Sequence, residues 1–247
     1  MTQATSFGPV APFYDDLMKV VPYRMWVGYY LLLLSQIDAH PRRMLDVCCG
    51  TGAMCQLLTQ EGFELTGFDL SPDMIRIAQA KARKKLLKIR YEVADAADFD
   101  LGDTFPAAFS FFDSLNNIVE PDRFRSAMRC VARHLEPGGS FIFDLNTAYA
   151  FEQRMFDQQE TGDRSKLRYK WVGDWDAGTR VITVHMTFWH EDQEFEETHV
   201  QRAYSDAEVR EAMEAAGFGD VHAYASYTLD PPKAKSDRVH YVCIKRG

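Results

Sequence analysis

The sequence is poor in cysteine, and the cysteines it has are not spaced like metal ligands. There are five, an odd number, and no two of them form a CxxC pair. Cys48, Cys49 and Cys55 lie close to one predicted strand and the turn after it, which suits small buried side chains in a reducing compartment. We therefore expect no metal site and a cytoplasmic location.

Long apolar runs are also missing. Met1 to Pro9 show neither a basic start nor an apolar stretch of the kind found in a secretory signal. The longest apolar patch, around Tyr29 to Leu34, is too short to span a bilayer. These absences predict a soluble protein without a membrane partner.

Positive charge is in deficit. The 36 acidic residues outnumber the 28 lysines and arginines, and the net charge is −8. An acidic surface repels phosphate backbones, so binding to nucleic acid would require a local basic patch. The segment from Lys81 to Lys85, with Lys88 and Arg90, offers one, but it alternates with apolar residues and is more typical of a solvated helix end. We expect no nucleic acid partner.

Short apolar runs alternate with helical periodicity through the first half of the chain. Ser71-Pro72-Asp73 is a strong helix start, with a capping serine, a proline in the first turn and an acid near the helix dipole. Alternation of this kind predicts right-handed βαβ units and a parallel sheet covered on both faces. We expect an α/β fold: a doubly wound, Rossmann-like, mostly parallel sheet of seven strands, at 44–48, 64–69, 89–94, 107–112, 141–145, 221–227 and 238–245.

The length of 247 residues favours one domain with an insertion. Residues 13–34 are helical in pattern, with a break at Pro22, and form an expected N-terminal helical lid or cap within 1–40. Alternating segments at 167–175, 180–190 and 195–204, separated by turns at 176–179 and 191–194, predict an antiparallel β-meander. The predicted division is a cap at 1–40, a core at 41–150, an insertion at 151–204, and a last helix from Ser205 with two strands at 205–247.

Three acids stand at or near the ends of consecutive predicted strands: Asp46, Asp69 and Asp95. In open parallel sheets, ligands bind beyond the carboxyl ends of the strands. Gly50 and Gly52 let the backbone turn sharply and approach a ligand without an intervening Cβ. Asp69, at the end of the second strand, is placed to accept hydrogen bonds from both ribose hydroxyls. Each acid could instead be a structural acceptor, a helix cap or a solvated loop residue.

Two features separate this pattern from a dinucleotide site. The segment Gly50-Thr51-Gly52-Ala53-Met54-Cys55 has no third glycine at the dinucleotide spacing. Asp46 precedes the glycines, and its charge is repulsive beside a pyrophosphate but favourable beside a cationic sulfonium cofactor. The residues favour S-adenosyl-L-methionine (SAM) over NAD.

Four segments resemble motifs of the class I SAM-dependent methyltransferases, in particular the members that act on small molecules. The first contains the strand and glycine loop, the second the acid and cap of the next βα unit, the third the adenine-contacting pair, and the fourth the turn before the fifth strand. They are Leu45–Gly52, Phe68–Met74, Asp95-Ala96 and Leu135–Ser140. The resemblance covers about residues 44–145 well, and the chain from Ser205 onward more loosely.

The resemblance implies SAM as cofactor, with S-adenosyl-L-homocysteine (SAH) as product, and assigns roles to single residues. The glycines approach the methionine part and the first acid holds its amino group. The second acid holds the ribose, the third acid and its neighbour meet the adenine, and aromatics of the N-terminal segment close over the cofactor. The implied contacts are Gly50, Gly52, Asp46, Asp69, Leu70 beside the adenine, Asp95, Ala96, Tyr14, Trp26, and Asp113 facing the sulfonium.

Candidates for catalysis and for acceptor binding are less defined. Asp113 and Asn116 follow the fourth strand, where such enzymes face the acceptor. The third meander strand carries His199 and Gln201 on one face, and Arg202 with Tyr204 on the other, so His199, Arg202 and Tyr204 are candidate pocket residues. His185 and His190 are five apart on one strand and face opposite sides, which argues against a shared metal.

The sequence therefore predicts an enzyme that methylates a small polar molecule, with nitrogen favoured over oxygen or carbon because no metal set for oxygen activation is evident. An RNA methyltransferase would use the same cofactor site. A non-catalytic SAM-binding protein would keep Asp46 and Asp69 without an acceptor cleft, and an NAD oxidoreductase is the weakest alternative. Both a monomer and a homodimer fit the sequence.

Overall fold

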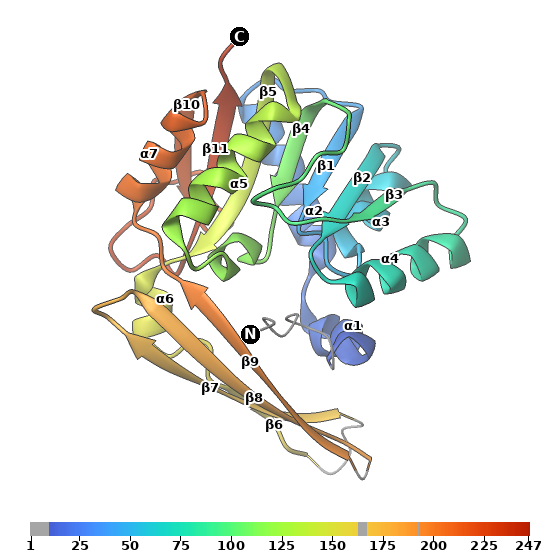
Figure 1. Ribbon diagram of the computed structural model, residues 1–247, viewed down its shortest axis with the longest axis vertical. Helices are drawn as coiled ribbons and strands as arrows, with labels where there is room; N and C mark the ends of the chain where they lie inside the picture. The colour runs from blue at the N-terminus through green and yellow to red at the C-terminus, as the bar shows by residue number, and fades with distance from the viewer. Residues whose placement is uncertain (1–9, 163–166, 192) are drawn as a thin grey trace.

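The computed structural model describes residues 10–162, 167–191 and 193–247, so the predicted absence of a signal at Met1 to Pro9 lies outside the described residues. A seven-stranded sheet has the order β10-β11-β5-β4-β1-β2-β3, parallel except for the pairs that involve β11 (Figure 1). The predicted doubly wound fold is confirmed. Its strands are β1 Arg43–Val47, β2 Glu64–Asp69, β3 Arg90–Val93, β4 Phe105–Ser110, β5 Leu135–Asn146, β10 Phe218–Ala225 and β11 Arg238–Lys245.

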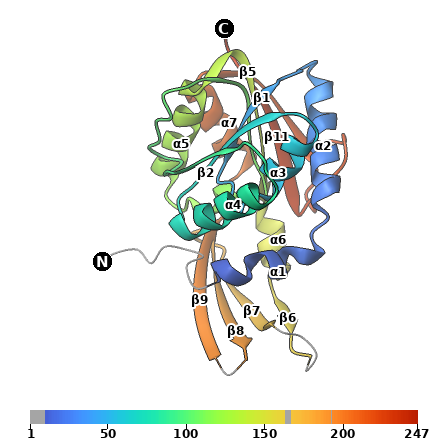
Figure 2. The same cartoon turned by 90° about the vertical axis from the view of Figure 1, so that its right-hand side faces the viewer.

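Helices cover both faces of this sheet (Figure 2). Alternate strand residues point to opposite faces, so Met44 packs in the cluster with α2 and α3 while Leu45 packs in the cluster with α5 and α7. The helix starts behave as their sequences predict: Ser71 Oγ accepts from Met74 N, and Ser205 forms a capping box with Glu208. The helices are α2 Tyr23–Gln36, α3 Ala53–Gln60, α4 Pro72–Lys84, α5 Pro121–Arg133 and α7 Asp206–Ala215.

The N-terminal segment breaks at Pro22, as predicted. It consists of the short helices η1 Ala11–Phe13, α1 Tyr14–Leu17 and η2 Met18–Val20, and α2 begins only after the proline. Val10 and the partly buried Phe13 and Leu17 pack into the cluster formed by the insertion. Within the described ranges, no helix is long and apolar enough to cross a membrane.

The insertion folds into a second, antiparallel sheet with the order β6-β7-β8-β9, next to the carboxyl edge of the large sheet (Figure 1). The predicted meander is confirmed in β7 Leu167–Asp176, β8 Val181–His190 and β9 Gln193–Arg202, after the short helix α6 Ala148–Glu152. Alternation buries Ile182, Val184, Met186 and Phe188 on one face. The strand β6 Gln158–Glu160 was not predicted, because its three residues are polar and exposed and carry no alternation.

Two turn predictions needed correction. The expected turn at Pro137-Gly138-Gly139 lies inside β5, which begins at Leu135 with an irregular register against β4 and a positive φ of 76° at Gly138. The expected turn at 191–194 is shorter, because β8 extends to His190 and β9 resumes at Gln193; Asp192 lies outside the described residues.

Candidate active site

Asp46 is a buried acid inside the carboxyl end of β1. Its side chain points toward α3, where Cys55 Sγ donates to its Oδ2 at 3.1 Å, and the residue is 3% exposed. Burial raises the pKa of Asp46 to about 8; the Cys55 hydrogen bond opposes this shift and the charge of Asp69 adds to it. A cation placed beside a buried carboxyl group stabilises its ionised form.

Gly50 and Gly52 both adopt the left-handed conformation, with φ of 54° and 74°. A Cβ on Gly50 would meet nothing within 4 Å, whereas one on Gly52 would lie 2.9 Å from Cζ of Tyr91 and closer still to its hydroxyl. The loop therefore needs glycine for its backbone at both positions and for close packing at the second. The open space is at Gly50, on the side where a ligand would approach.

The Asp69 side chain forms hydrogen bonds with both the glycine loop and the loop that precedes α4. Its Oδ2 accepts from Gly50 N at 2.8 Å and its Oδ1 accepts from Ser71 N at 2.9 Å. Burial raises the pKa of the Asp69 carboxyl, and the backbone N–H groups oppose that rise. The acid does not cap α4, which Ser71 does, so its carboxylate stands at the strand end between the two loops.

The predicted adenine-side residues lie farther along the same edge. Asp95 Oδ1 accepts from Ala97 N at 2.9 Å, and its other oxygen is paired with Arg123 of α5. Ala96 is buried, and Leu70 is 56% exposed. The sequence did not identify Arg123 as a partner, since nothing local links it to a residue 28 positions earlier.

The N-terminal segment is fastened to the glycine loop by a polar cluster that the sequence did not predict. Thr51 Oγ1 donates to Asp15 Oδ1 at 2.7 Å, and Lys81 of α4 pairs with Asp15 Oδ2 at 2.6 Å and donates to Thr51 at 3.2 Å. Lys81 is thus engaged and is not part of a freely solvated helix end. Burial, Tyr23 and the charges of Asp113 and Asp69 raise the pKa of Tyr14.

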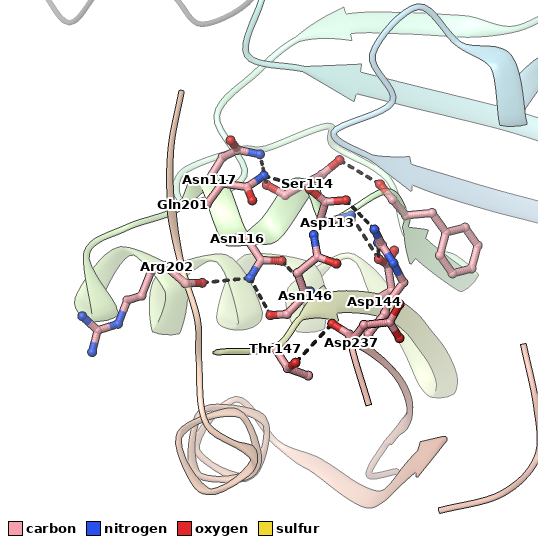
Figure 3. A network of polar contacts seen from close by, with 12 residues as sticks. Asp113, Ser114, Asn116, Asn117, Asp144, Asn146, Thr147, Gln201, Arg202 and Asp237 are labelled. Carbon is pink, nitrogen blue, oxygen red and sulfur yellow. Dashed lines mark hydrogen bonds and ion pairs between the residues drawn. The ribbon is translucent and has the colours of Figure 1, made fainter. Parts of the chain in front are cut away.

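Beyond β4 the chain turns through two consecutive left-handed residues, Phe112 and Asp113, with φ of 64° and 50°. Arg238 of β11 donates to Asp113 Oδ1 at 2.9 Å and also to Asp144 of β5, while Gln201 of β9 donates to Asp113 Oδ2 at 2.8 Å (Figure 3). Asp113 N donates to Asp144 at 3.0 Å. The sequence placed Asp113 at the acceptor side, and the structure adds partners from three distant strands.

Asn116, predicted as a catalytic candidate, has its side-chain amide engaged in hydrogen bonds within the fold. The residue is fully buried in η3 (Ser114–Asn117), and its Nδ2 donates to the carbonyls of Asn146 at 3.1 Å and Arg202 at 2.8 Å. Its Oδ1 accepts from Asn146 N at 3.0 Å. The amide thus ties β5, β9 and η3 together and keeps no capacity for proton transfer.

Trp26, predicted to close over the cofactor, lies in a buried aromatic cluster. Its indole is 3% exposed and packs in the core, with ring centroids 4.4 Å from Phe112 and 5.2 Å from Tyr227. Arg238 lies over its face at 5.4 Å. Trp26 therefore supports the arginine that holds Asp113.

Arg202 and Tyr204, predicted as pocket residues, have their side chains engaged with α5 and α7, on the face of β9 opposite to His199 and Gln201. Arg202 pairs with Glu208 at 3.2 Å, and its guanidinium extends away from the network in Figure 3. Tyr204 stacks on Phe124 at 4.0 Å and donates to the carbonyl of Ile118. Both residues pack the end of β9 onto α5 and α7.

His199 faces the site side of β9 together with Gln201, and both are 6% exposed. Its Nε2 lies 2.9 Å from Glu197 Oε2, and Glu197 Oε1 accepts from Val10 N at 2.7 Å. Strand alternation predicted the shared face, but Glu197 was overlooked although the same period places it there.

The carboxyl edge of the large sheet thus presents acids at the ends of β1, β2 and β4 around an open glycine loop. Asp46 favours a cationic group, and Asp69 has the two acceptor oxygens that a vicinal diol requires. These donor and acceptor positions fit SAM, which carries an ammonium, a sulfonium and a ribose. They do not suit a pyrophosphate, because Asp46 would repel it.

Comparisons with known proteins agree with this geometry. Residues 44–139 match the family described as a methyltransferase domain. A protein of Geobacillus sp. (strain WCH70), named as a methyltransferase, is 30% identical over 241 residues, which cover 95% of this chain and 98% of its own. This chain belongs to the class I SAM-dependent methyltransferase family.

Two solved structures share the fold of this methyltransferase over nearly its full length. A SAM-dependent methyltransferase from Clostridium acetobutylicum has a TM-score of 0.85 and 24% identity, covering 98% of this chain and 99% of its own. A sugar N-methyltransferase from Streptoalloteichus sp. has a TM-score of 0.76 and 21% identity, covering 95% and 93%. The methyltransferase is therefore an enzyme that uses SAM, in a fold shared with these proteins.

The two glycines of the methyltransferase loop should respond differently to alanine. We expect Gly50→Ala to cost about 1 kcal/mol of unfolding free energy, from left-handed strain alone. Gly52→Ala should cost about 3 kcal/mol, because the new Cβ also collides with Tyr91. Urea unfolding measures both, and Tyr91→Phe should restore part of the Gly52→Ala loss. Equal losses at the two glycines would contradict this packing argument.

Proposed function

We propose that this methyltransferase methylates a nitrogen atom of a small polar amine. Bound SAM supplies a methyl group on a positively charged sulfur. The protein's own task is then to bind both reactants, align the acceptor at about 3 Å from that methyl group, and exclude water. Asp46 would hold the amino group of SAM, Asp69 its ribose, and Asp95 its adenine amino group, with Tyr14 and Asp113 near the transferred methyl.

The enclosure of the site is the observation that carries the proposal of a small acceptor. The N-terminal segment is fastened to the core through Asp15, Thr51 and Lys81, and to β9 through Val10 and Glu197. These contacts put one chain segment across the space between the two sheets. A folded RNA would have to displace this segment to reach the proposed site, which favours a small acceptor.

The acidic residues near the site support an amine as the methyl acceptor. Asp113 follows the end of β4 and Glu197 lies on β9, so each sheet contributes an acid beside the proposed site, and acids attract an ammonium. The shared fold with a solved sugar N-methyltransferase is consistent with this acceptor class. Oxygen acceptors usually need a metal or a strong base. Across the described ranges, no group of three or more His, Cys, Asp or Glu side chains is arranged to hold a metal.

Transfer of isotopically labelled methyl from SAM tests the proposal. The panel contains a nucleotide-linked amino sugar, glycine, a catechol, a quinol with a free ring carbon, and bulk RNA. We expect label on nitrogen of one of the two amines. Label only on oxygen or carbon would overturn the nitrogen assignment, and label in RNA would overturn the small acceptor.

The raised pKa of Asp46 predicts a pH-dependent affinity for SAM. In the free protein this carboxyl is protonated up to about pH 8, and the cationic amino group of SAM favours its ionised form. Binding at pH 6.5 should therefore release about one proton, and affinity should rise by up to about tenfold per pH unit from pH 6 toward pH 8.

Calorimetry in buffers of different ionisation enthalpy measures this proton release. Asp46→Asn should abolish the release and flatten the pH dependence between pH 6 and 8. Without SAM, the same group lowers stability as pH rises from about 4 to 8, because the unfolded carboxyl ionises first. Unchanged proton release in Asp46→Asn would remove this residue from the amino-group site.

A further inference from the structure

We propose that His199 and Glu197 form a dyad that accepts the proton of the methyl acceptor. The inference rests on the proposed function, since it concerns an amine that arrives as an ammonium ion. The two side chains lie on one strand of the small sheet, 2.9 Å apart between Nε2 and Oε2. They would act on the substrate, while SAM is held by the large sheet.

Burial makes this pair unusual on its strand. The side chains of Glu197 and His199 are 6% and 7% exposed, whereas the neighbouring Glu194 and Glu196 point to solvent. Glu197 shares its face with the apolar residues of β8, and its cross-strand partner is Met186. Placing a carboxylate there is costly unless it is paired, and its partners are His199 and the N–H of Val10.

The position of β9 brings the pair to the carboxyl edge of the large sheet. His199 and Gln201 are two residues apart and point the same way, about 7 Å along the strand. Gln201 reaches Asp113, the residue at the end of β4, and the Arg202 carbonyl is held by Asn116 of η3 (Figure 3). The imidazole of His199 is thus two residues along β9 from Gln201, the side chain that contacts Asp113.

The chemistry of the step is a simple proton transfer. The N–H bond of the acceptor ammonium breaks, its electron pair stays on nitrogen, and the proton moves to the imidazole of His199. The Glu197 carboxylate stabilises the imidazolium that forms. The freed lone pair then bonds to the methyl carbon while the carbon–sulfur bond breaks and its electron pair stays on sulfur, which gives SAH. The imidazolium later releases its proton to water.

The charges around His199 determine how this step is observed. Glu197 lies on the same strand, and Gln201, two residues farther along that strand, donates to Asp113. Asp113 is itself paired with Arg238 of β11. SAM and SAH have nearly the same shape, but only SAM carries the sulfonium charge. A positive charge near an imidazole changes the electrostatic environment of its ring nitrogens.

Nitrogen-15 NMR of the histidine side chains at a fixed pH of 6.5 tests whether His199 lies near bound SAM, and it needs no acceptor. We expect the ring-nitrogen resonances of His199 to differ between the SAM and SAH complexes, because the two ligands differ in charge beside the proposed acceptor position. His185 is the matched control, because it lies on the adjacent strand β8 but on the exposed face, and its resonances should be the same in both complexes. Identical His199 resonances in the two complexes would overturn the proposal.

Activity toward the nucleotide-linked amino sugar or glycine, whichever accepts methyl, tests the role. His199→Gln and Glu197→Gln should lower kcat about 100-fold with little change in SAM affinity, and His185→Gln should leave kcat unchanged. Glu197→Gln keeps an acceptor oxygen for Val10 N–H, so a merely structural role predicts near wild-type kcat in that variant. Absence of an amine acceptor alongside a SAM-dependent change at His199 would refute the nitrogen assignment while supporting the placement of the dyad.

Discussion

Replacing Asp69 by alanine is expected to weaken SAM binding by at least about 100-fold. The carboxylate offers two charged acceptors to the ribose diol, and hydrogen bonds to charged groups contribute about 1.5–3 kcal/mol each. The same substitution frees Gly50 N and Ser71 N, which the carboxylate now holds at 2.8 and 2.9 Å. Loss of the contact with the ligand and a looser glycine loop act in the same direction. Calorimetry with SAM measures the effect.

Asp73, an acid in the first turn of the helix α4 that follows Asp69, provides the control. Asp73 is partly exposed and pairs with Arg76 at 2.8 Å, so Asp73→Ala should leave SAM binding within about twofold of wild type. Asp69→Asn keeps one acceptor oxygen and should fall between the two. SAM affinity in Asp69→Ala equal to that in Asp73→Ala, with both proteins folded, would remove Asp69 from the ribose site.

Replacing Arg238 by methionine is expected to destabilise the protein by about 3–5 kcal/mol. The arginine lies between Asp113 and Asp144, and Asp144 is fully buried. Removing the cation leaves both carboxylates without their partner in a low-dielectric site, which costs more than the intact pair contributes. Burial raises the pKa of Asp144 to about 6 even though Arg238 opposes the shift, so the variant should be less impaired at pH 5 than at pH 8. Urea unfolding at both pH values measures this.

An exposed ion pair and a compensating substitution sharpen the test. Arg210 pairs with Asp206 at the surface of α7, and Arg210→Met should cost less than about 1 kcal/mol. Adding Asp144→Asn to Arg238→Met should restore part of the lost stability, since one buried charge disappears. A loss in Arg238→Met as small as that in Arg210→Met, or one independent of pH, would show that the network is not a buried charge cluster.

The fold followed from local patterns. The helix start at Ser71, the break at Pro22 and the alternating meander strands appear where the sequence placed them, because capping, proline sterics and side-chain period act within a few residues. β6 was missed because three exposed polar residues carry no period. The irregular start of β5 resembled a turn because proline and glycine mark both features.

The positions of the residues proposed to bind the cofactor were also accessible from sequence, since strand ends in a doubly wound sheet meet at one edge. Asp46, Gly50, Gly52 and Asp69 lie together as expected. The contacts of the residues proposed for the acceptor side were not accessible. Asn116 was taken for a catalytic candidate because an amide after β4 gives no indication of the distant carbonyls that occupy it.

The sequence by itself determined the sheet, its helices and the acids along its carboxyl edge, because each depends on contacts between near neighbours or on the order of βα units. Only the tertiary structure decided which polar groups meet there. Asp15 reaches Thr51 across 36 positions, Gln201 reaches Asp113 across 88, and Arg238 reaches Asp113 across 125. Such pairs leave no periodic trace in the chain, since the packing of three separate segments at one sheet edge brings them together.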